Sequence, residues 1–206
     1  MAEKTLHDMF IDEIRDTYDA ERQLVKALPR IAKAATSPEL QEAITAHLAE
    51  TEGQVERLER IFELLGERPR GKHCDGMAGI IEEGKSVMEE ELDEATMDAC
   101  LIAAAQRAEH YEMAAYGTLA AWAKAMGHEE AAGLLNETLE EEKAADEKLN
   151  RIAEGSVNPQ AAEMAHGEDE TEEEDARPSP RRGGSPARKS PPSKRPARKS
   201  PAKARR

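Results

Sequence analysis

The amino-acid sequence predicts an all-α protein, and three observations support this fold class. Ala, Glu, Leu and Lys are abundant among the 206 residues, and these residue types favour helix. Aromatic residues make up only 3% of the chain, whereas β-sandwiches and barrels draw on aromatic and β-branched residues. Apolar residues also recur at intervals of three and four along several long segments, which is the period of an amphipathic helix.

The first two predicted helices form an antiparallel hairpin. One covers about residues 5–35 and the other about residues 38–65, each with a single apolar stripe. Ser37 suits the N-cap of the second helix and Pro38 its first helical position, so the chain turns there with almost no loop. Gly66 ends the second helix.

The remaining two long helices form a second hairpin, at about residues 94–126 and 129–153. Gly127 lies in the tight turn between them, and Gly155 is expected to end the last helix. The connection between the hairpins, residues 66–93, begins as a loop and includes a short extra helix. Two hairpins joined by one long crossover describe the topology of ferritin-like four-helix bundles rather than the up-down-up-down kind.

Charge and proline content divide the chain into three parts. The helical domain is expected at 1–155, and an acidic linker follows at 156–175. Residues 176–206 hold 12 Lys or Arg and no Asp or Glu, and most of the prolines of the chain lie there. Because this last part has few apolar residues to bury, we expect a disordered basic tail. The overall net charge of −14 therefore averages an acidic bundle and a basic tail.

Each long helix interrupts its apolar stripe with polar residues near the middle. The first helix places Glu21 there, and the second places Gln54 there, with Glu50 and His47 one and two turns earlier. The third and fourth helices contribute Glu109, Glu112, Glu142 and Asp146. In both hairpins these residues lie about 15 residues from the turn, or roughly 23 Å along a helix. The polar residues of all four helices should therefore meet at one level of the bundle.

Carboxylates in a bundle interior are unstable as unpaired anions. They can take up protons, pair with Lys or Arg, or bind a cation, and the stripes supply no Lys or Arg at this level. Oxygen ligands with some amide or imidazole nitrogen suit Mn, Fe or Mg better than copper or a zinc-thiolate site. We therefore expect two Fe or Mn ions, with these ligands: Glu21, Glu50, Gln54, Glu109, Glu112, Glu142 and Asp146. The alternative is that some of these side chains face solvent, since the chain has 43 acidic residues.

Four segments resemble the YciE/YciF family of ferritin-like bacterial stress proteins. They read DTYDAERQL, HLAETEGQVERLE, LIAAAQRAEHYEMAAYGTLAAWAKAMG and LLNETLEEEKAADEKL. The resemblance covers roughly residues 1–153 and implies a homodimeric, cytoplasmic protein with a di-metal centre. The wider superfamily uses a lone Glu on two helices, which Glu21 matches, and Glu-x-x-His on two others. No Glu-x-x-His occurs in the four helices, and His47 and Glu50 stand in the reverse order.

The basic tail resembles the Lys-, Pro- and Ala-rich ends of histone-like bacterial proteins. Its positive charges can neutralise phosphates and release counterions, so we expect contact with DNA that does not depend on base sequence. The expected contacts are Arg181, Arg182, Arg188, Lys189, Lys194, Arg195, Arg198, Lys199, Lys203, Arg205 and Arg206. The alternative is a solubilising tail that folds back on the acidic part of the chain.

These features predict a stress-related metal-binding protein that oxidises Fe(II) with oxygen or peroxide, held near DNA by its tail. The alternative function is a non-enzymatic dimeric scaffold without bound metal. No apolar run approaches the ~18 residues that a membrane helix needs, and the sequence MAEKTLHDMF does not resemble a secretory signal. Cys74 and Cys100 do not make a disulfide framework. We therefore expect a cytoplasmic protein, associated with the nucleoid and not with a membrane.

Overall fold

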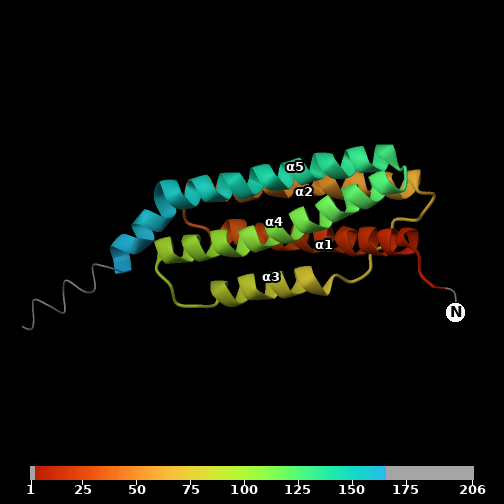
Figure 1. The fold of residues 1–206 in the computed structure, drawn as a ribbon. Helices are drawn as coiled ribbons and strands as arrows, with labels where there is room; N and C mark the ends of the chain where they lie inside the picture. Colours follow the sequence, from red (N-terminus) through yellow and green to blue (C-terminus); the bar gives the residue numbers. More distant parts are fainter. Residues whose placement is uncertain (1–2, 166–206) are drawn as a thin grey trace, which may run out of the picture.

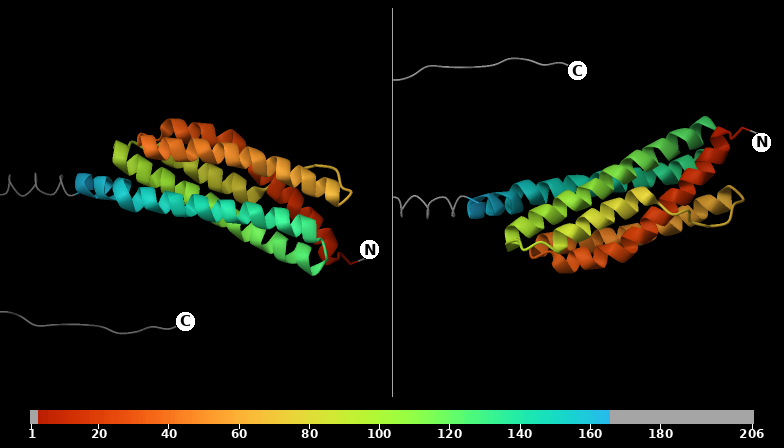
Figure 2. Two further views of the ribbon diagram at one scale, coloured as in Figure 1. Left: turned by 90° about the horizontal axis from the view of Figure 1, so that it is seen from above. Right: turned by 90° about the horizontal axis from the view of Figure 1, so that it is seen from below.

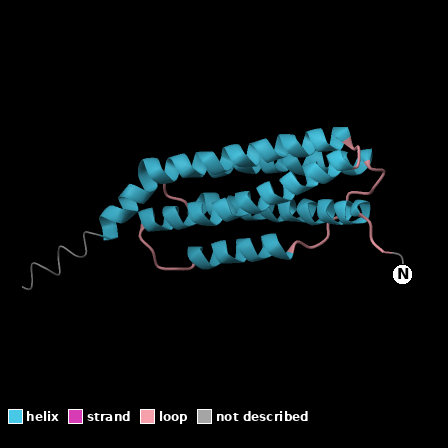
Figure 3. Cartoon of the chain, viewed as in Figure 1, coloured by secondary structure: helices cyan, strands magenta, loops and turns pink. Residues whose placement is uncertain are grey.

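A computed structural model describes residues 3–165 of the chain, and this part is helical with short loops (Figures 1 and 3). Its elements are α1 (Leu6–Ala34), α2 (Pro38–Leu64), α3 (Asp75–Met88), α4 (Glu94–Ala125), α5 (Glu129–Ile152) and the π-helical turn η1 (Ala153–Val157). The basic tail 176–206 and the second half of the predicted acidic linker, residues 166–175, lie outside the described residues.

Four long helices form the bundle, and the short helix α3 lies outside it. α1 contacts α2 and α4, and α5 contacts the same two helices, so α1 and α5 lie diagonally opposite each other. α3 packs against α1 and α4 and carries the chain back along the bundle, so that α4 begins at the end where α2 begins (Figures 1 and 2). The predicted ferritin-like bundle with one crossover and an extra short helix is confirmed.

The hairpin turns follow the sequence signals. The Ser37 side chain accepts a hydrogen bond from the backbone amide of Leu40, and Pro38 occupies the first helical position of α2. Asp98 of α4 accepts hydrogen bonds from the backbone amides of Thr36 (2.8 Å) and Ser37 (2.7 Å), which ties this turn to the second hairpin. Gly127, between α4 and α5, has φ = 79°, a conformation that favours glycine.

The interior contains two apolar cores with a polar level between them. Leu28, Ile44 and Leu101 belong to one core, and Phe10, Ile61 and Leu119 to the other. On α2, α4 and α5, buried polar residues separate the residues of the two cores, and on α1 the buried polar residues Thr17 and Glu21 lie where the two cores meet. The bundle therefore divides its core at the depth that the sequence pattern predicts.

The chain beyond α5 differs from the prediction. Gly155 does not end the helical path, because η1 continues directly into helical residues that extend to 165. Val157, only 2% exposed, packs against the core that contains Leu28. A glycine inside a helix costs about 1 kcal/mol, and burial of Val157 offsets that cost. The helical part therefore extends past the predicted domain boundary at 155.

No helix in residues 3–165 combines the length and the apolar character required to cross a membrane.

Candidate metal centre

Buried polar side chains from all four long helices meet in the level between the two apolar cores. We call them the carboxylate cluster: Glu21 from α1, His47 and Gln54 from α2, Glu109 and Glu112 from α4, and Glu142 from α5. No member is more than 7% exposed. Positions three apart on α4 and seven apart on α2 lie on nearly the same helix face, so each of these two helices directs two side chains inward.

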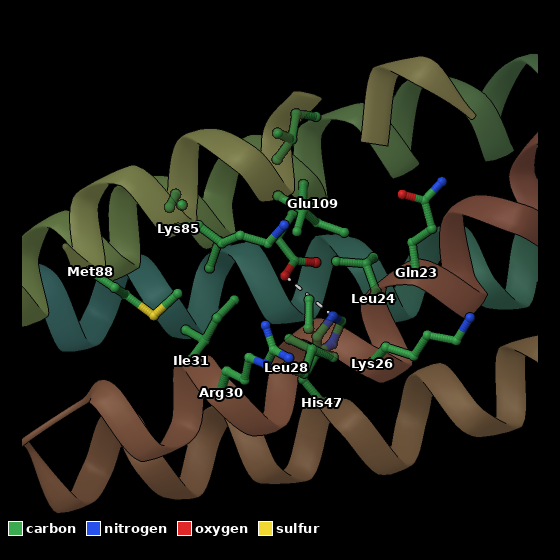
Figure 4. Close-up of a pocket in the computed structure, with 17 residues that line it drawn as sticks. Gln23, Leu24, Lys26, Leu28, Arg30, Ile31, His47, Lys85, Met88 and Glu109 are labelled. Atoms are coloured by element: carbon green, nitrogen blue, oxygen red, sulfur yellow. Dashed lines mark ion pairs between the residues drawn. The ribbon is translucent and has the colours of Figure 1, made fainter. Parts of the chain in front are cut away.

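Four members of the carboxylate cluster lie close enough together to share an ion. His47, Glu109, Glu112 and Glu142 each offer one ligand atom, and these atoms all lie within 4.8 Å of one another. His47 Nε2 lies 3.4 Å from Glu109 Oε1, and the two side chains point toward each other from α2 and α4 (Figure 4). Carboxylate oxygens and one imidazole nitrogen therefore converge on one point.

Hydrogen bonds hold the other two members, Gln54 and Glu21, in place. Gln54 Nε2 donates to Glu142 Oε1 at 2.5 Å, and the Tyr116 hydroxyl donates to Glu21 Oε1. Burial raises the pKa of the Tyr116 hydroxyl well above its ordinary value, and the adjacent Glu21 raises it further. Tyr116 therefore stays protonated and serves Glu21 as a donor.

Unpaired atoms are concentrated in the carboxylate cluster. Among the described residues, nine buried side-chain nitrogen or oxygen atoms have no hydrogen-bond partner, and seven of them belong to this cluster. They are Glu21 Oε2, His47 Nδ1, Gln54 Oε1, Glu109 Oε2, Glu112 Oε1, Glu112 Oε2 and Glu142 Oε2. Buried polar atoms normally have partners, because leaving one unpaired costs about 1–3 kcal/mol. So many in one place indicate a site that could bind a ligand able to pair with several of these atoms at once.

Burial also shifts the acidity of the cluster. It raises the pKa of Glu21 to about 8, helped by the negative charge of Glu142. Burial raises the pKa of Glu109 and of Glu112 well above their ordinary values, and neighbouring carboxylates raise both further. Without a cation these carboxyl groups therefore retain protons near neutral pH. A bound cation would favour their charged forms.

Two side chains outside the cluster orient Gln54, and the sequence pattern did not reveal them. Gln54 Nε2 also donates to Glu141 Oε2 at 3.1 Å, and Arg57 Nη1 donates to the same oxygen at 2.8 Å. These contacts leave the amide oxygen of Gln54 without a partner and available as a ligand. Arg57 lies three residues after Gln54, and this spacing on α2 is the signal that could have found it.

Two of the predicted ligands lie outside the cluster. Glu50 has a side chain 51% exposed, with a carboxylate oxygen 3.6 Å from His47 Nδ1, and the contact with His47 lowers the pKa of Glu50. Asp146 accepts hydrogen bonds from Gln106 (3.0 Å) and Asn150 (3.2 Å). Each stands three or four residues from a buried member, which is about 40–60° around the helix. On α4 the same offset keeps Glu109 and Glu112 both inside, whereas the packing around α2 and α5 leaves Glu50 and Asp146 nearer the edge of the bundle. His47, which the predicted ligand set leaves out, takes the inward position instead.

The donor set suits a hard metal ion. It consists of carboxylate oxygens, one amide oxygen and one imidazole nitrogen, which are ligands for Mn, Fe or Mg. No Cys belongs to the cluster, since Cys74 and Cys100 are free thiols elsewhere in the described part of the chain. The residues present therefore fit a hard divalent metal ion.

The fold and this site define a ferritin-like protein with a buried group of Glu and His side chains that could hold a metal ion. A family model described as a domain of unknown function, DUF892, matches residues 5–162. The chain belongs to this family. Protein YciF of Escherichia coli K12 is 47% identical to it over 163 residues, which are 79% of this chain and 98% of YciF.

Solved structures agree with this assignment. The crystal structure of the E. coli stress protein YciF superimposes with a TM-score of 0.73 at 47% identity, over 76% of this chain and 99% of that one. YcfI from Rhodopseudomonas palustris gives a TM-score of 0.72 at 43% identity, over 73% and 96%. A protein from Xanthomonas campestris, 22% identical over 78% and 99%, shares the fold with a TM-score of 0.60. The resemblance to the YciE/YciF family is confirmed.

Proposed function

We propose that this protein is a stress-related metal-binding protein whose carboxylate cluster holds two Fe or Mn ions. The observation that carries the proposal is the set of seven unpaired buried atoms at one depth of the bundle. These atoms belong to the six side chains of the carboxylate cluster. In ferritin-like bundles, a pair of iron or manganese ions is commonly held by six carboxylate and imidazole side chains. A divalent cation would also offset the repulsion among Glu21, Glu109 and Glu112.

The proposed activity is oxidation of Fe(II). Two Fe(II) ions lose one electron each, and one hydrogen peroxide molecule takes up both electrons and two protons to give two water molecules. The bound ions supply the redox chemistry. The chain holds and orients the ions, excludes bulk water from the cluster, and gives up carboxyl protons when the ions bind.

Anaerobic titration with Fe(II) tests the site. The wild-type protein should take up two ions per chain, and the double variant Glu21→Ala, Glu109→Ala should take up none. The matched control is Glu56→Ala, Glu140→Ala, because both residues are exposed on helices of the same bundle. Unchanged uptake by the first double variant would overturn the site assignment. Adding peroxide to the loaded protein and following the absorbance of Fe(III) tests the activity separately.

A non-enzymatic scaffold without metal is the second candidate, and the raised pKa values favour it. Carboxyl groups that stay protonated near neutral pH need no cation. Thermal melts with and without Mn(II) distinguish the two candidates. A metal site gains about 2.7 kcal/mol of stability when the free ion is at 100 times its Kd, whereas the scaffold should melt at the same temperature in both conditions.

We propose further that the basic tail contacts DNA without sequence preference. Its support is the charge of residues 176–206, which lie outside the described residues. Gel shifts should compare the full chain with a 1–165 truncation, which keeps the whole described fold. The full chain should bind at ~50 mM salt and much more weakly at ~200 mM salt. Equal binding by both forms would refute the role of the tail.

A further inference from the structure

A cavity of about 270 Å³ lies between α1, α3 and α4 and reaches the carboxylate cluster. Its lining includes His47 and Glu109, the pair joined by the dashed line in Figure 4. The volume lies just below the usual range for small-molecule pockets, about 300–1,000 Å³. A neighbouring cavity of about 280 Å³, lined mainly by α2 and α5, also reaches His47 and Glu109.

Small and apolar residues line the cavity. Gly84 of α3 and Ala104 of α4 lie next to each other in its wall, since a Cβ on Gly84 would make an ordinary contact of 3.7 Å with the Cβ of Ala104. Leu24 and Leu28 of α1 form part of the wall, and Ile80, Ile81 and Met88 of α3 line the cavity as well. The three α3 side chains are only partly buried in the described fold. A chain of apolar carbon atoms would complete their burial.

Positive charge surrounds the cavity, although the bundle is acidic. The lining includes Lys26, Arg30 and Lys85 and only one carboxylate, that of Glu109. Residues 1–160 contain 17 basic and 35 acidic residues, so this local excess of cations is opposite to the average. Lys26 and Arg30 are exposed and form no ion pair within the described residues, whereas Lys85 contacts Glu82 at 2.8 Å.

We propose that this cavity binds a small organic acid with an apolar chain. The carboxylate of the ligand pairs with Lys26 and Arg30, which stand exposed on α1, and the chain extends between α1 and α3. The far end of the chain then lies beside His47 and Glu109, the part of the lining that belongs to the carboxylate cluster. This site goes beyond the proposed metal function, and the ligand binds whether or not the cluster holds an ion.

Calorimetric titration of the full-length, metal-free protein with octanoate tests the charge requirement. Octanoate should bind, while octanol, which lacks the charge, and acetate, which lacks the chain, should bind at least about tenfold more weakly. The double variant Lys26→Ala, Arg30→Ala should weaken octanoate binding by a similar factor. Lys33→Ala is the matched control, because Lys33 is an exposed cation of α1 that does not line the cavity. Equal affinity of the double variant and the control would overturn the proposal.

Filling the cavity tests its position. Ala27→Phe places a ring in the cavity from α1 and should abolish octanoate binding. Ala144→Phe, which lies in the neighbouring cavity and away from Lys26 and Arg30, should leave binding unchanged. Circular dichroism checks the fold of both variants. If Ala27→Phe does not fold, the double variant Lys26→Ala, Arg30→Ala still tests the proposed site. Absence of octanoate binding to the wild-type protein would overturn the proposal. If sedimentation then shows that the wild type is a dimer and that Ala27→Phe is a monomer, this face is an interface between two copies of the chain.

Discussion

Glu21 illustrates how one side chain acquires its properties from three helices. It lies on α1, accepts a hydrogen bond from Tyr116 of α4, and is repelled by the charge of Glu142 on α5. Its second oxygen, Oε2, has no partner. In solution the same carboxyl group would have a pKa of 4.5, and burial is the main reason that the value in the fold is about 8. The residue is therefore both a candidate ligand and a buried acid.

This shift predicts the pH dependence of the metal-free protein. Between pH 4.5 and about 8 the folded state binds a proton at Glu21 that the unfolded state releases. The contribution of Glu21 to stability is therefore full below pH 4.5 and lost as the pH rises to about 8. Glu21 alone should lower the free energy of unfolding by up to about 1.4 kcal/mol per pH unit in this window.

Urea unfolding of the chelator-treated protein at pH 5, 6, 7 and 8 measures this slope. Glu21→Gln is neutral at every pH and should make the slope less steep, while Glu109 and Glu112 keep their own contribution; the exposed Glu140→Gln should leave the slope unchanged. Identical slopes for the wild type and Glu21→Gln would contradict the assigned pKa.

At the scale of elements, α3 depends on a polar anchor at its first turn. Cys74 caps the helix, because its sulfur accepts a hydrogen bond from the backbone amide of Met77 at 3.4 Å. The Tyr111 hydroxyl lies 3.0 Å from Cys74 Sγ and donates to Asp16 Oδ2 at 3.0 Å. Burial raises the pKa of the Cys74 thiol, so this group stays protonated and hydrogen-bonded. The short helix is thus held to α1 and α4 at one end.

Two glycines of α3 should respond oppositely to alanine. A Cβ on Gly76 would lie 2.8 Å from Tyr111 Cε2, and the anchored ring cannot move away, so Gly76→Ala should lower the free energy of unfolding by ~1–3 kcal/mol. A Cβ on Gly79 would meet nothing within 4 Å, so Gly79→Ala should raise it by ~0.5–1 kcal/mol. Urea unfolding measures both. A destabilisation by Gly79→Ala as large as that by Gly76→Ala would contradict the packing described here.

At the scale of the whole molecule, the bundle accommodates its polar level by placing an apolar core on each side of it. The core that contains Leu28 and Ile44 also includes Val157 of η1, so the fold does not end with α5. The family model agrees, because it extends to residue 162. The folded unit is therefore longer than the domain 1–155 expected from the sequence.

Truncation tests this boundary. A chain ending at residue 165 should unfold at the same urea concentration as the full chain. A chain ending at residue 155 loses Val157 and should be less stable by ~1.5–3 kcal/mol, the value of one buried aliphatic side chain. Equal stability of the two truncated chains would show that η1 adds nothing to the core.

The periodic sequence by itself determined the four long helices, their two hairpins and the depth of the polar level. The turns depend on local residues, such as Ser37 and Gly127. The depth of the polar level follows from the number of residues between each turn and buried residues such as Glu21, because a helix rises by a fixed distance per residue. The resemblance to the YciE/YciF family could also be found in the sequence, because its four segments are long.

Only the tertiary structure decided which polar side chains turn inward. Glu50 and His47 lie three residues apart on α2, and the packing of α4 and α5 buries His47 while Glu50 stays exposed. The cavity beside His47 likewise depends on where α3 lies, which the sequence does not show. Helical periodicity fixes the spacing along a helix, but the rotation of a helix and the position of its neighbours are set by contacts between residues far apart in the chain.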